Sequence, residues 1–295
     1  MENNKATVAS SRKKRSQMRA IWIRLRRNKL AMCGLVVVVI LILLALFADQ
    51  IADYKTVAIK QNIPARYMRP CAEHIFGTDE LGRDIFARIV HGARISLVVG
   101  VVAVCIALLT GGVLGAVAGY FGGKVDNIIM RIMDVFLSIP ILLLAIMIVT
   151  ALGTSMFNLM LAIGLSSMPS FARIVRASVL GVKDQEYVEA AKAIGSNSFH
   201  IIFSHIIPNC LSPIIVQATL RVATSILSTA SLSFIGLGVK APSPEWGAML
   251  ASGRGAIRDA PHVVIIPGLF IMITILALNL LGDGLRDALD PKLKR

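Results

Sequence analysis

The stretch LAMCGLVVVVILILLALF, from Leu30 to Phe47, decides the fold class of this chain. It contains no charged residue, and as a helix rising about 1.5 Å per residue it nearly crosses a hydrocarbon core of about 30 Å. Its apolar part is too long for a cleaved signal peptide, and no small-residue cleavage site follows it. The whole chain is 56% hydrophobic and only 16% charged, whereas about a quarter of the residues in a soluble domain are charged. The sequence therefore predicts a membrane protein.

Further apolar runs follow the first, and together they predict an all-α membrane protein with six transmembrane helices. The fourth run is the shortest and is interrupted by a glycine and a serine pair. Pro140 in the third run and Pro267 in the sixth are predicted to bend their helices. The predicted spans are Leu30–Phe47, Ile95–Tyr120, Ile128–Leu152, Met156–Met168, Ile214–Leu237 and Val263–Leu281.

Positive charge beside the first span predicts the orientation of the chain. Residues 1–29 hold ten of its 31 Lys and Arg residues and a single acid, Glu2. Because Lys and Arg beside a span stay in the cytoplasm, both the N-terminus and, after six spans, the C-terminus are predicted to be cytoplasmic. The net charge of +14 then reflects topology and contact with anionic lipid rather than nucleic-acid binding, since no aromatic platform accompanies it.

This orientation divides the chain into three parts. The predicted parts are a basic cytoplasmic tail (1–29), a first transmembrane helix with an external segment (30–94), and a transmembrane core (95–291) that carries a cytoplasmic loop at 184–209.

Two patterns predict how the helices pack. Gly111, Gly115 and Gly119 recur at steps of four in the second span, which favours close backbone contact within this chain or with a second chain. Arg131 and Asp134 lie one turn apart in the third span and are predicted to pair with each other.

The most polar part of the core is EYVEAAKAIGSNSFHIIFSHIIPN, from Glu186 to Asn209, in the predicted cytoplasmic loop. Asp184 is a candidate N-cap for a first helix, and Gly195 suits the left-handed position that ends one. Ser196 or Asn197 can then cap a second helix. A helix as short as the first is marginal alone, so something should pack on it. The pattern fits either a hairpin resting on lipid headgroups or a docking element.

Particular residues in this loop resemble a known family. Glu189–Ala191, Gly195 and the pair Ile207–Pro208 look like the EAA loop of permease subunits of binding-protein-dependent ABC importers, with Ile207 where leucine is usual and His205 where many members have isoleucine. Two further stretches, His74–Leu97 and Ser231–Arg254, and the C-terminal GDGLRDALDP resemble the dipeptide, oligopeptide and nickel branch. The resemblance covers about residues 30–291.

The resemblance implies a type I importer permease in the cytoplasmic (inner) membrane of a bacterium or archaeon. Its implied partners are a second homologous permease, two cytoplasmic ATPase subunits and an external solute-binding protein, and its implied cargo is a peptide or a related solute such as a nickel chelate. In this family the loop docks on the ATPase subunit. The coupling residues it implies are Glu186, Glu189, Ala190, Ala191, Gly195 and Pro208.

The sequence predicts no catalytic residue, metal site or cofactor site in this chain. Its nearest approach to a phosphate-binding loop, Ala118–Val125, lacks the first glycine and the final Ser or Thr. ATP and magnesium are therefore expected on the partner subunits.

A polar stripe follows one face of the fifth span, at alternating steps of four and three. Because an arginine at the centre of a membrane helix costs about 2.5–3.5 kcal/mol on insertion scales, the stripe is predicted to line the translocation pathway. The alternative is helix packing, with the arginine reaching the cytoplasmic face. The stripe residues are Gln217, Arg221, Thr224, Ser228 and Ser231.

The external segments carry their own polar residues. Thr78 is predicted to cap a helix whose first turn holds Asp79 and Glu80, and Trp246 is predicted to anchor the chain at the membrane interface. The family resemblance implies that these segments face the binding protein, although they equally well brace the outer helix ends. The residues concerned are Thr78, Asp79, Arg83, Asp84, Glu245 and Trp246.

Two other function classes fit the sequence less well. A secondary transporter working without ATPase partners would show an inverted repeat and acids near the bilayer midplane, yet the well-buried stretches hold only Asp134, near one end. A membrane-embedded enzyme would need a catalytic cluster, and the five histidines are spread over both faces.

Overall fold

The computed structural model describes residues 19–289, and the regular secondary structure of this part of the chain is helical apart from one isolated bridge between Thr78 and Asp84. A helical segment at residues 19–27 precedes the named elements. The α-helices are α2 (Lys29–Leu46), α3 (Ala48–Ile51), α4 (Ile85–Phe121), α5 (Gly123–Leu137), α6 (Ile141–Leu152), α7 (Met156–Leu180), α8 (Glu186–Ala193), α9 (Ser198–His200), α10 (Leu211–Phe234), α11 (Trp246–Gly253) and α12 (His262–Leu289). The shorter turns are π-helical at Tyr54–Ala58 and Ile201–Ile206, and 3-10 at Ile63–Ala65, Ile207–Asn209 and Arg254–Ala256.

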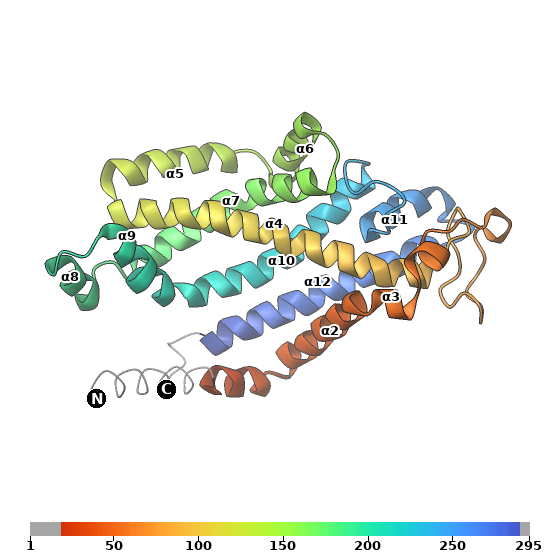
Figure 1. Cartoon of the computed structure of the whole chain (residues 1–295), viewed down its shortest axis with the longest axis horizontal. Coiled ribbons are helices and arrows are strands. Elements are labelled where there is room, and N and C mark those ends of the chain that lie inside the picture. Colours follow the sequence, from red (N-terminus) through yellow and green to blue (C-terminus); the bar gives the residue numbers. More distant parts are fainter. Residues whose placement is uncertain (1–18, 290–295) are drawn as a thin grey trace.

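The long helices run side by side along the long axis of an elongated bundle (Figure 1). Within the described range, α2, α4, α7, α10 and α12 are each long and apolar enough to cross a membrane, and α5 with α6 makes a sixth span if the pair is counted as one. One end of the bundle carries α8 and is called the α8 end. The opposite end carries α3 and α11 and is called the α11 end.

The third predicted span is broken rather than continuous. Helices α5 and α6 meet at 89° across the residues before Pro140. Pro140 has no backbone N–H to continue the helix and sits with an extended ψ of 133° at the N-cap of α6. The predicted bend at Pro140 is therefore confirmed, but Ile128–Leu152 does not form a single straight span.

Among the other predicted boundaries, the two largest differences are in the second and fourth spans. Helix α4 begins at Ile85 rather than Ile95, because the Asp84 carboxylate accepts a hydrogen bond from the Ala87 amide at 2.7 Å and caps the helix there. Helix α7 continues beyond Met168 to Leu180, through an internal proline. The second and fourth spans therefore belong to longer helices than their apolar runs indicated.

The glycine repeat of α4 lies against α7. A Cβ atom at Gly111 or Gly115 would collide with a backbone carbonyl oxygen of α7, that of Met168 or of Ala172, and one at Gly119 would lie 2.9 Å from Val179 Cβ. Only glycine lets the two backbones approach this closely. The predicted close packing is confirmed, and its partner is within this chain.

We expect Gly115→Ala to lower the thermal stability of the protein, because the added methyl group meets fixed backbone of α7. Overpacking of this kind typically costs about 1–3 kcal/mol. Gly112→Ala is the matched control, since its Cβ would find its nearest neighbour at 3.5 Å. Thermal unfolding in detergent, followed by circular dichroism, measures both. Equal melting temperatures for the two variants would contradict this packing.

Ion pairs join α5 to α7. The Arg176 guanidinium donates to both carboxylate oxygens of Asp126, at 2.5 and 2.6 Å, and Arg173 donates to Asp134 at 2.6 Å. The predicted pair between Arg131 and Asp134 is therefore wrong. The acid faces α7, where a guanidinium stands opposite it.

Candidate functional site

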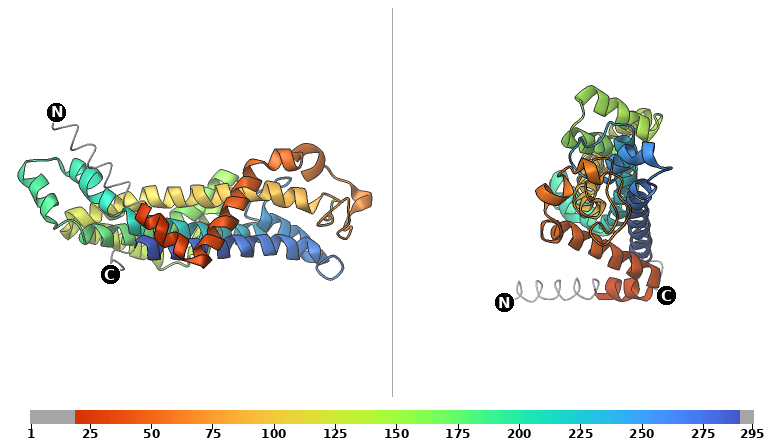
Figure 2. Two further views of the ribbon diagram at one scale, coloured as in Figure 1. Left: turned by 90° about the horizontal axis from the view of Figure 1, so that it is seen from below. Right: turned by 90° about the vertical axis from the view of Figure 1, so that its right-hand side faces the viewer.

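Helix α8 forms the tip of the α8 end, beyond the ends of α10 and α12 (Figures 1 and 2). It ends at a corner where Gly195 has a φ of +78°, a left-handed conformation that residues with a Cβ rarely adopt. The chain then turns back because the Asn197 side chain accepts a hydrogen bond from the Phe199 amide at 3.2 Å. The helix, the glycine corner and the Asn197 cap agree with prediction.

The second arm is less regular than predicted. Three residues of α9 lead into the π-helical turn Ile201–Ile206 and then the 3-10 turn that contains Pro208. The N-cap of α8 is Gln185, which makes no side-chain capping bond, and the predicted cap Asp184 lies one residue earlier.

One face of α8 packs within the chain. Val188 and Ala191 are buried, in one cluster with Ile201, Ile202 and Ile206 of the second arm. This packing gives the short helix the stiff base that it needs. Of the two alanines among the predicted coupling residues, Ala191 is therefore buried within the chain, whereas Ala190 is exposed.

The other face of α8 is open. Glu186, Glu189 and Ala190 are exposed, Tyr187 is 41% exposed and Ile194 is 82% exposed. Burial of the remaining part of Tyr187 raises the pKa of its phenol above the usual value, so the side chain is a neutral hydroxyl at pH 7. The tip thus presents apolar and acidic groups together.

The polar stripe of α10 is at least partly accessible in the described part of the chain. All five stripe residues are partly or fully exposed, whereas the polar residues that α10 buries, Ser225, Thr229 and Ser233, lie on another face. The Thr224 and Ser231 hydroxyls donate to carbonyl oxygens of their own helix, at 3.0 and 2.9 Å. The stripe is therefore not part of the buried core of this chain, and both the pathway role and the helix-packing alternative stay predictions.

One stripe residue lines a groove at the α8 end. The groove has a volume of about 500 Å³, and Gln217 lies in it together with Ser212 of α10, Ile174 of α7 and Arg286 of α12. The groove lies at the end of α10 that follows the loop at 184–209.

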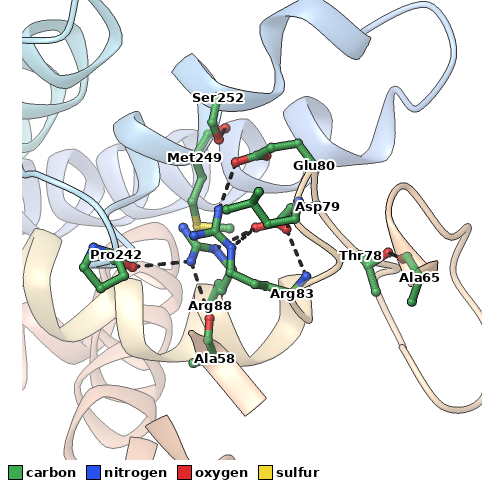
Figure 3. Close-up of polar contacts among 11 residues, drawn as sticks. Ala58, Ala65, Thr78, Asp79, Glu80, Arg83, Arg88, Pro242, Met249 and Ser252 are labelled. Carbon is green, nitrogen blue, oxygen red and sulfur yellow. Dashed lines mark hydrogen bonds and ion pairs between the residues drawn. The ribbon is translucent and has the colours of Figure 1, made fainter. Parts of the chain in front are cut away.

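Asp79 is the centre of a buried ion cluster at the α11 end (Figure 3). It accepts hydrogen bonds from the Leu81 and Arg83 amides at 2.9 Å, and from Arg83 Nε at 2.7 Å. Arg88 Nε lies 3.3 Å from the same carboxylate, and the side chains of Asp79, Arg83 and Arg88 are each 4% exposed. Arg83 also reaches Glu80 at 2.9 Å. One carboxylate thus stands between two buried guanidinium groups.

Arg88 connects this cluster to two other parts of the chain. Its Nη1 atom lies 3.4 Å from the carbonyl oxygen of Ala58, in the first external turn, and 3.5 Å from that of Pro242, before α11 (Figure 3). The first turn of α4 therefore holds both external segments. No local pattern in the sequence points to this role of Arg88, because its partner Pro242 is 154 positions away.

The predicted binding-protein-facing residues bond to other parts of this chain. Thr78 does not cap a helix, since its hydroxyl donates to the Ala65 carbonyl oxygen and accepts from the Met68 amide. Asp84 caps α4 and pairs with His74 at 2.8 Å.

Trp246 is not an interfacial anchor, because it is fully buried and its indole N–H donates to the Ile89 carbonyl oxygen at 3.0 Å. Glu245 is buried too and caps α11 through the amides of Gly247 and Ala248. All six predicted binding-protein-facing side chains are thus buried. Their burial favours the bracing alternative, while the contact of these segments with a binding protein stays a prediction.

The fold and the projecting loop define an integral membrane protein of the permease class. Residues 111–295 match the family of binding-protein-dependent transport system inner membrane components, and residues 16–70 match the N-terminal TM domain of oligopeptide transport permease C. The chain belongs to this family of ABC importer permeases, within its peptide branch, as the resemblance predicted.

Relatives and solved structures agree with this assignment. The chain is 49% identical to the dipeptide transport system permease protein DppC of Alkalihalophilus pseudofirmus, over 95% of this chain and 91% of that one. It is 47% identical to the glutathione transport system permease protein GsiD of Escherichia coli O6:K15:H31, over 95% and 92%. An inward-facing structure of the MetNI methionine ABC transporter matches its fold with a TM-score of 0.57 at 18% identity, over 69% of this chain and 96% of that one.

Proposed function

We propose that this chain forms half of the translocation pathway of an ATP-driven importer for short peptides. Cytoplasmic ATPase subunits drive it through the loop at 184–209, and a second, homologous permease completes the pathway. An external solute-binding protein delivers the cargo. In this account the α8 end is cytoplasmic, because the basic helical segment at residues 19–27 lies toward that end of the bundle (Figure 1).

The geometry of α8 carries this proposal. A helix that transmits force needs a stiff base and an open contact face. Val188 and Ala191 supply the base, while Tyr187, Ala190 and Ile194 supply the face. An exposed Ile194 at the tip of a projecting loop is typical of a surface that a partner covers. The exposed Glu186 and Glu189 add charges that a basic groove would complement.

The partly exposed stripe of α10 supports the pathway. A polar face on a membrane helix needs water or a partner, and the helices of residues 19–289 cover this one only in part. Two such faces, one from each permease, would enclose a polar passage. Hydroxyl and amide groups suit the peptide bonds of a cargo, and Arg221 suits its terminal carboxylate.

The cargo we propose is a di- or tripeptide or a molecule of similar size such as glutathione. Similar permeases carry the names dipeptide, di/tripeptide and glutathione transport system permease. A nickel chelate, which the resemblance also allowed, stays a prediction without further support. The solute-binding protein then contacts the outer face through side chains other than the six buried ones.

Uptake of a radiolabelled dipeptide into cells that lack and then regain this chain tests the proposal. We expect Ser228→Phe to reduce uptake by on the order of tenfold or more, since an aromatic ring in the passage obstructs cargo. Ile215→Phe, on the opposite face of α10 and 44% exposed, is the matched control and should leave uptake near wild type. Equal loss in both variants, or uptake that continues without ATP, would contradict the proposal.

A further inference from the structure

The helical segment at residues 19–27 packs on the end of α12. Leu25 is 5% exposed and lies in one cluster with Ala31 and Ala288, with Ile21 and Leu285 against it. The segment joins α2 through Asn28, whose side chain accepts a hydrogen bond from the Ala31 amide at 3.1 Å.

Gly284 allows this close approach. A Cβ atom there would collide with the side chain of Ala31 and lie 3.2 Å from Leu25. The segment is thus held at a defined position beside α12 (Figure 1).

A basic pocket opens between the segment and α12. It has a volume of about 480 Å³ and is lined by Arg24, Arg27, Asn28, Gly284, Asp287 and Ala288. The lining therefore holds two guanidinium groups and one carboxylate. The surrounding residues 19–29 carry five basic side chains and no acid. Within the described part of the chain, Arg24 and Arg27 form no ion pair with a carboxylate. The positive charges of Arg24 and Arg27 are therefore available to an anionic ligand in the pocket.

The pocket lies at the depth of lipid headgroups. Helix α2, with a mean hydropathy of 2.9, begins directly after it at Lys29. On the same segment Trp22 is 49% exposed and Ile23 is 46% exposed. Tryptophan and basic residues together at the end of a span are typical of the membrane interface. A ligand that suits both features has an anionic head and an apolar body.

We propose that this pocket binds the headgroup of an anionic phospholipid from the same leaflet. Arg24 and Arg27 donate hydrogen bonds to the phosphodiester oxygens, a geometry that guanidinium groups favour. The acyl chains lie beside the exposed Trp22 and the start of α2. The bound lipid thereby ties the N-terminal segment and α12 to the membrane. This site is independent of peptide transport and of the coupling loop.

Native mass spectrometry of the whole complex, purified in mild detergent and titrated with phosphatidylglycerol or phosphatidylcholine, tests the site. We expect phosphatidylglycerol to bind preferentially. Arg24→Gln with Arg27→Gln should weaken its binding by about 25-fold, since each arginine near an anionic surface contributes about fivefold. Asp287→Asn, which removes the acid from the pocket, should strengthen it.

Arg69→Gln with Arg258→Gln is the matched control, because it also removes two exposed arginines, one in the segment before α4 and one just after the 3-10 turn that follows α11. These changes should leave phosphatidylglycerol binding unchanged. Equal binding in wild type and the Arg24/Arg27 variant would overturn the proposal. So would displacement of the lipid by millimolar inorganic phosphate, which would make the pocket a site for free anions.

Discussion

Replacing Gly195 by proline is expected to abolish peptide uptake while the chain still inserts into the membrane. Gly195 holds a φ of +78°, whereas proline is locked near about −65° and lacks the N–H. The Gly195 amide donates to the Lys192 carbonyl oxygen at 3.0 Å, a bond that the change removes. The turn at Gly195 would be lost and α8 would leave its position at the tip. In the proposed mechanism, ATP hydrolysis by the partner subunits could then no longer drive transport.

A graded series makes this result specific. Gly195→Ala keeps the N–H but places a Cβ at positive φ, which costs about 1–3 kcal/mol and should lower uptake about 5- to 150-fold. Gly195→Asn should reduce uptake least of the three variants, since asparagine tolerates this conformation. No atom lies within 4 Å of a Cβ at Gly195, so steric collision does not explain a loss. Gly255 also lies in open space but has no positive φ, so Gly255→Ala should leave uptake unchanged. Full uptake by the proline variant would rule out this role for the corner.

Replacing Asp79 by alanine is expected to be the most destabilising single change at the α11 end. It leaves Arg83 and Arg88 buried without their shared carboxylate, and breaking a buried ion pair from one side costs about 3–5 kcal/mol. The external segment before α4 would also lose the hydrogen bonds that fix its turn. A fall in melting temperature, measured on the purified chain, reports this loss.

The exposed pair of Arg94 and Asp49 provides the matched control. Its nitrogen and oxygen atoms are 3.1 Å apart, but the two side chains are 51% and 57% exposed. Surface pairs contribute about 0–1 kcal/mol, so Asp49→Ala should change the melting temperature little. If Asp79→Ala and Asp49→Ala had the same small effect, the cluster of Figure 3 would not hold the outer segments together.

Local signals in the sequence predicted the features that depend on local structure. Hydropathy predicted the spans, because the hydropathy of an uncharged run depends only on the residues within that run. Glycine and asparagine located the corner after α8, because φ preference and capping depend on the nearest residues. The bend at Pro140 followed from its missing N–H, although the sequence did not predict a break of 89°.

Features that depend on distant partners were mispredicted. Asp134 pairs with Arg173, 39 positions away, rather than with its neighbour Arg131. The buried state of Trp246 depends on the Ile89 carbonyl, 157 positions earlier. A tryptophan in a polar external loop looks the same in the sequence whether it anchors to lipid or fills the space between helices.

Co-purification tests the central claim most directly, namely that the loop at 184–209 couples this permease to ATPase subunits. The tagged chain would be purified from its native membranes in mild detergent, its companions identified, and ATPase activity assayed. We predict a second permease and ATPase subunits with the wild-type chain, and loss of the ATPases when Glu189→Lys and Gly195→Pro are combined. Peptide transport in vesicles by the chain alone, without ATP or companions, would contradict the claim.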